Sequence, residues 1–139
     1  MGKTIGAIVA VFVAWTAMDF VIHGMLLQSL YAKTPDLWRP QEEYKTGLMF
    51  FVTIVEAITF VSVYSLFFKE KNLMVGLKYG ALFGIGAGIS MGYGSFSYMP
   101  IPYYVALSWF LATLAEALVA GAIVGAMVKG ESPVAAPAE

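Results

Sequence analysis

The sequence predicts an all-α integral membrane protein whose four transmembrane helices form two tandem, parallel two-helix repeats. The chain is 60% hydrophobic and only 12% charged, whereas a typical soluble domain carries about 25% charged residues. Glu116 is the only charged residue between Lys78 and Lys129. A bilayer explains so long an uncharged stretch, because a charge at its centre costs several kcal/mol.

Four segments are long and apolar enough to cross the hydrocarbon core, which takes about 20 residues of helix. They cover residues 4–27, 47–68, 77–98 and 104–128. Residues 1–130 are therefore expected to form one transmembrane domain, with a first repeat over about 4–68 and a second over about 77–129. The tail, residues 131–139, contains Pro133 and Pro137 and is expected to be disordered.

The second and fourth spans share a sequence match. Thr53-Ile-Val-Glu56-Ala in the second span corresponds to Thr113-Leu-Ala-Glu116-Ala in the fourth. Each half contains two spans, so both halves enter the membrane in the same direction, and a pseudo-twofold axis along the membrane normal would relate them. The alternative is chance similarity between apolar helices that use few residue types.

Basic residues predict the orientation, because they are enriched on the cytoplasmic side. One side would carry Lys3, Lys69, Lys71, Lys78 and Lys129. The loop on the other side, residues 31–45, balances its basic residues with acidic ones. We therefore expect both termini in the cytoplasm and the protein in a bacterial inner membrane. Tyr31, Trp38 and Tyr44 of this loop are typical of the lipid headgroup region.

Four ionisable residues lie inside the expected spans, namely Asp19, His23, Glu56 and Glu116. Three buried carboxylates cannot all stay ionised without a countercharge, so either most are protonated or a cation lies among them. We therefore predict a proton or metal site built from these four residues, with Thr53, Thr59 and Thr113 as supporting polar groups. The sequence leaves open whether the four side chains converge, and it puts His23 nearest the outer interface.

Two alternatives exist for these residues. Carboxylate and imidazole ligands suit zinc, iron or manganese, so a divalent metal is compatible with the sequence, although no recognised metal motif requires one. In a purely structural alternative, Glu56 and Glu116 are protonated and bond to threonine hydroxyls or to the backbone of neighbouring helices. Asp19 and His23, four residues apart, would then form a local pair on one helix face.

Small residues recur at spacings of four in the second half of the chain. They are Gly80, Gly84, Gly88 and Gly92 in the third span and Gly121 and Gly125 in the fourth. Inside lipid, helices associate where small residues let their backbones approach closely. Such stripes could serve packing within the chain, homo-oligomerisation or docking to a larger membrane complex.

Composition narrows the function. The chain has no cysteine, which excludes thiol catalysis and thiolate metal sites, and its net charge of −1 makes nucleic acid an unexpected partner. No catalytic motif is present, so we assign no catalytic residues. We predict a non-catalytic accessory or scaffolding subunit of a larger membrane assembly, with lipid and further subunits or copies of itself as partners. The alternative is a protein that binds or transports a proton or metal ion.

Overall fold

The computed structural model describes residues 2–128 and 130, which form helices and connecting turns without any strand. The predicted tail, residues 131–139, lies outside this part of the chain. The helices are α1 (Gly2–Val21), α2 (Gln28–Tyr31), α3 (Thr46–Phe67), α4 (Leu73–Ile89), α5 (Ser95–Tyr98) and α6 (Tyr103–Met127). Two π-helical turns, Ile22–Leu26 and Ser90–Gly94, extend α1 and α4.

Four of these helical segments are long and apolar enough to cross a membrane, as predicted: Gly2–Leu26, Thr46–Phe67, Leu73–Tyr98 and Tyr103–Met127. The all-helical class is confirmed as well. The largest difference in bounds is at the start of α4, which begins at Leu73 rather than at residue 77. The Asn72 side chain caps this helix by accepting a hydrogen bond of 2.9 Å from the Val75 backbone N–H.

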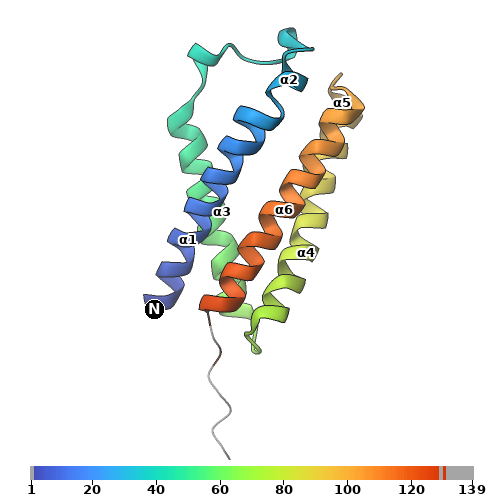
Figure 1. Ribbon diagram of the computed structural model, residues 1–139. Helices are drawn as coiled ribbons and strands as arrows, with labels where there is room; N and C mark the ends of the chain where they lie inside the picture. Colours follow the sequence, from blue (N-terminus) through green and yellow to red (C-terminus); the bar gives the residue numbers. More distant parts are fainter. Residues whose placement is uncertain (1, 129, 131–139) are drawn as a thin grey trace, which may run out of the picture.

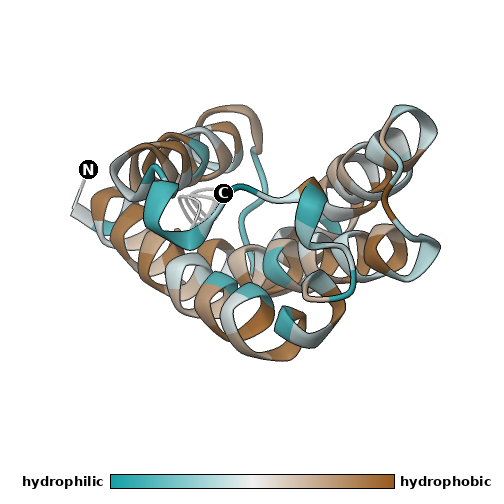
Figure 2. Cartoon of the chain, turned by 90° about the horizontal axis from the view of Figure 1, so that it is seen from above, coloured by the Kyte–Doolittle hydropathy of each residue, from teal (hydrophilic) through white to brown (hydrophobic). Residues whose placement is uncertain are grey.

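The long helices form two pairs. α1 packs against α3, α4 packs against α6, and α1 also contacts α6, so that α1 and α6 are the central helices. The start of α1 and the end of α6 lie at one end of the molecule, which we call the terminal end (Figure 1). The loop that contains α2 and the turn after α5 lie at the opposite, loop end. Apolar residues cover much of the helices, as the view onto the loop end shows (Figure 2).

Glycines bring α4 and α6 into backbone contact. A Cβ atom at Gly80 would strike the carbonyl oxygen of Ala117, and one at Gly92 would strike that of Ala106. Gly76, Gly84, Gly88, Gly121 and Gly125 make similar approaches, closer than a Cβ would tolerate. The glycine stripe predicted from the sequence therefore lies between two helices of the same chain, and Gly76 extends it by one turn.

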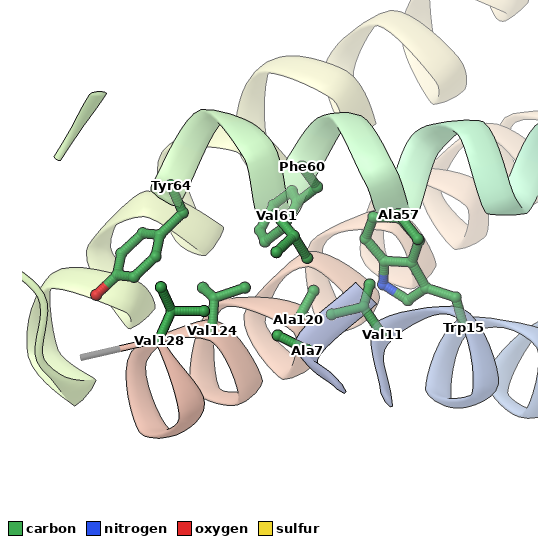
Figure 3. Packing of buried hydrophobic residues seen from close by; sticks show 10 residues of the cluster. All are labelled: Ala7, Val11, Trp15, Ala57, Phe60, Val61, Tyr64, Ala120, Val124 and Val128. Atoms are coloured by element: carbon green, nitrogen blue, oxygen red, sulfur yellow. The ribbon is translucent and has the colours of Figure 1, made fainter. Parts of the chain in front are cut away.

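A hydrophobic core fills the space between the two pairs toward the terminal end (Figure 3). Its members are Ala7, Val11 and Trp15 of α1, Ala57, Phe60, Val61 and Tyr64 of α3, and Ala120, Val124 and Val128 at the end of α6 and just beyond it. Phe60 is 1% exposed, and its ring contacts both Trp15 and Tyr79. This core fills the space between the pairs at the terminal end, and a second apolar cluster, in which Trp38 and Trp109 pack against residues such as Val105, lies at the loop end.

Candidate functional site: a polar cavity between the helix pairs

A cavity of about 390 Å³ lies between the two helix pairs, on the loop-end side of the core. All four long helical segments contribute to its wall. Asp19 and His23 reach it from the first segment, Glu56 from α3 and Glu116 from α6. The structure thus brings the four ionisable residues around one space, a point that the sequence left open. His23 lies in the π-helical turn after α1, at the loop end of the cavity.

Asp19, Glu56 and Glu116 place three carboxyl groups on the wall of this cavity, and we call them the carboxyl cluster. Asp19 and Glu116 are neighbours, and Glu56 lies farther from both. One oxygen of Glu116, Oε1, is buried and has no hydrogen-bond partner among the described residues. No lysine or arginine of the described chain lines the cavity. Such a set of acids favours bound protons or a bound cation over three free carboxylates.

The threonines on α3 do not bond to the cluster. Thr53 donates to the Met49 carbonyl oxygen at 3.1 Å, and Thr59 donates to the Val55 carbonyl oxygen at 2.9 Å. Their hydroxyl protons are therefore not donated to Glu56, whereas their oxygens can still accept a hydrogen bond from a protonated acid, as the structural alternative requires. Thr53 and Thr113 line the cavity, whereas Thr59 lines a second cavity next to it.

His23 belongs to a hydrogen-bond chain at the loop end. Its Nδ1 lies 2.6 Å from the Tyr31 hydroxyl, which also accepts a bond of 2.8 Å from the Trp109 indole N–H. Because an indole N–H can only donate, the hydroxyl proton of Tyr31 is free to be donated to Nδ1. When Tyr31 donates in this way, the proton of a neutral His23 imidazole lies on Nε2, which is 3.9 Å from an Asp19 carboxyl oxygen.

Tyr31 and Trp38 lie next to the cavity at the loop end, where they contact its lining residues His23 and Trp109. The Trp38 indole donates to the Tyr31 carbonyl oxygen at 3.1 Å and packs edge-on against Trp109, with ring centroids 6.0 Å apart. Burial raises the pKa of the Tyr31 hydroxyl above its ordinary value, although the bond from Trp109 acts in the opposite direction. The hydroxyl therefore stays protonated near neutral pH and can serve as the donor to His23.

The cavity opens sideways, between α3 and the α4 segment. Glu56 is exposed on this side, and Phe83 and Met91 are 41% and 54% exposed. A second cavity of about 240 Å³ adjoins the first and shares Glu56 and Phe83 with it. The rest of its wall is almost entirely apolar, and includes Val63 and Phe60. An apolar groove therefore runs along the side of the molecule to the carboxyl cluster.

The arrangement does not suit a divalent metal. Protein ligands bind zinc or calcium at about 2.0–2.6 Å and so must converge on one point. Within residues 2–128 and 130, no three His, Asp or Glu side chains are grouped closely enough to hold an ion. The acids surround a wider space, which fits protons or a larger cation.

Sequence reasoning missed the tryptophans of this site. Trp15, Asp19 and His23 follow one another at spacings of four, which places them on one helix face. Trp109 and Glu116 are seven residues apart, which likewise places them on one helix face. The Trp15 indole donates to the Glu116 backbone carbonyl at 2.8 Å and ties α1 to α6 at the base of the cavity. A search for aromatic residues on the same face as each acid would have found both.

No protein-family model, curated protein or solved structure matches this chain. The functional argument therefore rests on the geometry and chemistry of the cavity.

Proposed function

We propose that the chain is an integral membrane protein that binds protons or another cation in the cavity between its helix pairs and moves them across the membrane. One observation carries this proposal. Three carboxyl groups and one imidazole, from α1, α3, α6 and the turn after α1, line one cavity that receives no lysine or arginine from the described residues. Ionisable groups inside a membrane are costly and are typical of proton and ion pathways.

The surface supports a membrane location. Large apolar side chains point outward from the helices, and Phe20, Leu66, Phe67 and Leu82 are each more than two-thirds exposed. In water, so much exposed apolar surface would favour association, whereas lipid solvates it. We further propose that the terminal end, which carries Lys69 and Lys71, faces the cytoplasm of a bacterium.

The proposed repeat is supported by the positions of the two glutamates. Glu56 on α3 and Glu116 on α6 occupy matching sequence positions and line the same cavity. The two helix pairs nevertheless pack differently, since α4 and α6 approach more closely than α1 and α3. A duplication followed by divergence accounts for this difference, because only the second pair carries the glycine stripe.

An accessory or scaffolding function has less support than cation binding. One of the observations that favour it is a glycine stripe available for docking, and contacts between α4 and α6 occupy that stripe. The accessory function also gives no reason for three acids around one cavity. Purification of the protein from native membranes as a stable, monodisperse species without partners would count further against it.

Transport requires a second conformation. The core around Phe60 closes the path toward the terminal end, and Tyr31, Trp38 and Trp109 cover the loop end. In the present state the cavity is reached from the side, between α3 and α4. We propose that the helix pairs rock against each other to open the core, while the carboxyl cluster holds the cation between them.

Proton flux into liposomes tests this function. Liposomes that contain the protein and an internal pH dye should acidify faster than empty ones when a membrane potential drives protons inward. Glu116→Gln keeps the shape of the side chain but removes its titration, and should slow this flux about tenfold or more. Glu70→Gln, in the loop between α3 and α4, is the matched control and should leave it unchanged. Unchanged flux in both Glu116→Gln and Glu56→Gln would refute the proposal.

A further inference from the structure

The space around the carboxyl cluster is larger than a proton or a bare metal ion needs. A cavity of about 390 Å³ falls within the range of about 300–1,000 Å³ that is usual for small-molecule sites. The acids line its wall without being grouped as metal ligands anywhere in the described chain. Carboxylates spread over such a wall suit a cation whose charge lies inside a sizeable organic group.

The other wall residues complement an organic cation. Trp15, Phe83 and Trp109 line the same cavity as the acids. Aromatic faces attract ammonium groups through their quadrupole, and tryptophan does so best. Because quaternary ammonium groups are weakly hydrated and partly apolar, a site of rings and carboxylates can hold them without the complete ligand shell that a metal requires.

The adjoining groove indicates the shape of the ligand. It meets the main cavity at Glu56 and Phe83 and is otherwise lined mainly by apolar side chains. A ligand with its charge at the carboxyl cluster could therefore place an apolar tail of several carbons along the groove. Both cavities lie at the side that opens between α3 and α4, where an amphipathic molecule dissolved in the bilayer would arrive.

We infer that the cavity and groove together bind an amphipathic organic cation, with an ammonium head among the acids and tryptophans and an apolar tail between α3 and α4. This inference rests on the proposed cation-binding function and specifies its substrate class. The same carboxyl groups can hold either a proton or the ammonium head. Exchange of one for the other would therefore couple transport of the organic cation to transport of protons in the opposite direction.

Calorimetric titration of the protein in phosphatidylcholine nanodiscs tests the inference, with empty nanodiscs as the baseline. Three probes distinguish the contribution of the positive charge from that of the apolar tail: hexyltrimethylammonium, tetramethylammonium and hexanesulfonate. We expect saturable binding of hexyltrimethylammonium at one site per chain, about tenfold or more tighter than tetramethylammonium, because its tail buries apolar surface. Hexanesulfonate has the same tail and the opposite charge, and should not bind. These comparisons use the unaltered protein and do not depend on the folding of any variant.

Variants then locate the site. Glu116→Gln should weaken hexyltrimethylammonium binding about tenfold or more, because the ammonium loses a carboxylate neighbour. Val63→Trp, which fills the groove, should remove most of the difference in affinity between hexyltrimethylammonium and tetramethylammonium. Glu42→Gln, an acid in the loop outside the cavity, is the control and should change nothing.

Equal binding of hexanesulfonate, no saturable heat above empty nanodiscs, or unchanged binding in both Glu116→Gln and Glu56→Gln would overturn the inference. Proton flux measured on the same preparations separates this failure from that of the proposed function. Flux that depends on Glu116 without binding of hexyltrimethylammonium would refute the organic cation alone. If the protein neither binds hexyltrimethylammonium nor shows proton flux that depends on Glu116, the cation-binding function is refuted as well.

Discussion

Replacing Phe60 by alanine should destabilise the helix assembly by about 3–5 kcal/mol, the usual effect of removing a buried phenylalanine. Its ring is 1% exposed and joins α3 to two other helices. The ring centroids lie 5.5 Å from Trp15 on α1 and 4.4 and 5.1 Å from Tyr79 and Phe83 on α4. Reversible unfolding in mixed micelles with increasing dodecyl sulfate would measure the change.

The same substitution should also raise proton leak through liposomes, because Phe60 belongs to the core that closes the terminal end of the cavity. Phe67→Ala removes the same side chain from α3 at a position that is 77% exposed. We expect it to alter stability by no more than about 0.5 kcal/mol and to leave the leak unchanged. Similar results for the two alanine variants would mean that the core does not seal the cavity.

Replacing Gly80 by alanine should separate α4 from α6 and lower stability by about 1–3 kcal/mol, the usual range for overpacking. The added Cβ would meet the carbonyl oxygen of Ala117, and a backbone atom cannot move aside as a flexible side chain can. The displacement would also shift Phe83, one turn away in the cavity wall. Thermal unfolding in detergent, together with proton flux, would detect both effects.

Gly86→Ala is the matched control on the same helix. Nothing lies within 4 Å of a Cβ at this position, and alanine favours helix over glycine by about 1 kcal/mol. We therefore expect Gly86→Ala to be neutral or slightly stabilising. Equal destabilisation by the two alanine substitutions would contradict the assigned packing between α4 and α6.

Much of the fold could be predicted from the sequence because long uncharged apolar segments dictate helices wherever a bilayer is the solvent. Hydropathy predicts the helix ends to within a few residues. The largest difference is at α4, which begins four residues earlier than hydropathy predicts because the Asn72 side chain caps it there. The glycine spacing identified a close helix contact, but not its partner. Which helix meets Gly80 depends on tertiary packing, which a periodic pattern in one segment does not encode.

The candidate site was predicted in part. The sequence identifies four candidate residues, because ionisable side chains inside an apolar span are rare. They are Asp19, His23, Glu56 and Glu116. Their convergence around one cavity could not be derived, since it depends on the rotation of each helix about its axis. The hydrogen bonds of the Tyr31 hydroxyl to His23 and Trp109 could not be derived either, because they join residues from three separate segments of the chain.

Thiol labelling at Thr113 tests the central claim most directly, namely that rocking of the helix pairs opens the cavity to water and that the cavity selects cations. The chain has no native cysteine, so Thr113→Cys would be the only thiol, at a position in the cavity wall. We predict that a trimethylammonium methanethiosulfonate reagent labels it in membranes about tenfold or more faster than the sulfonate reagent, because the acids concentrate cations. Leu111→Cys, whose position is 52% exposed on the apolar surface of α6, should react with neither. An unreactive Thr113→Cys, or equal rates with both reagents, would contradict the account.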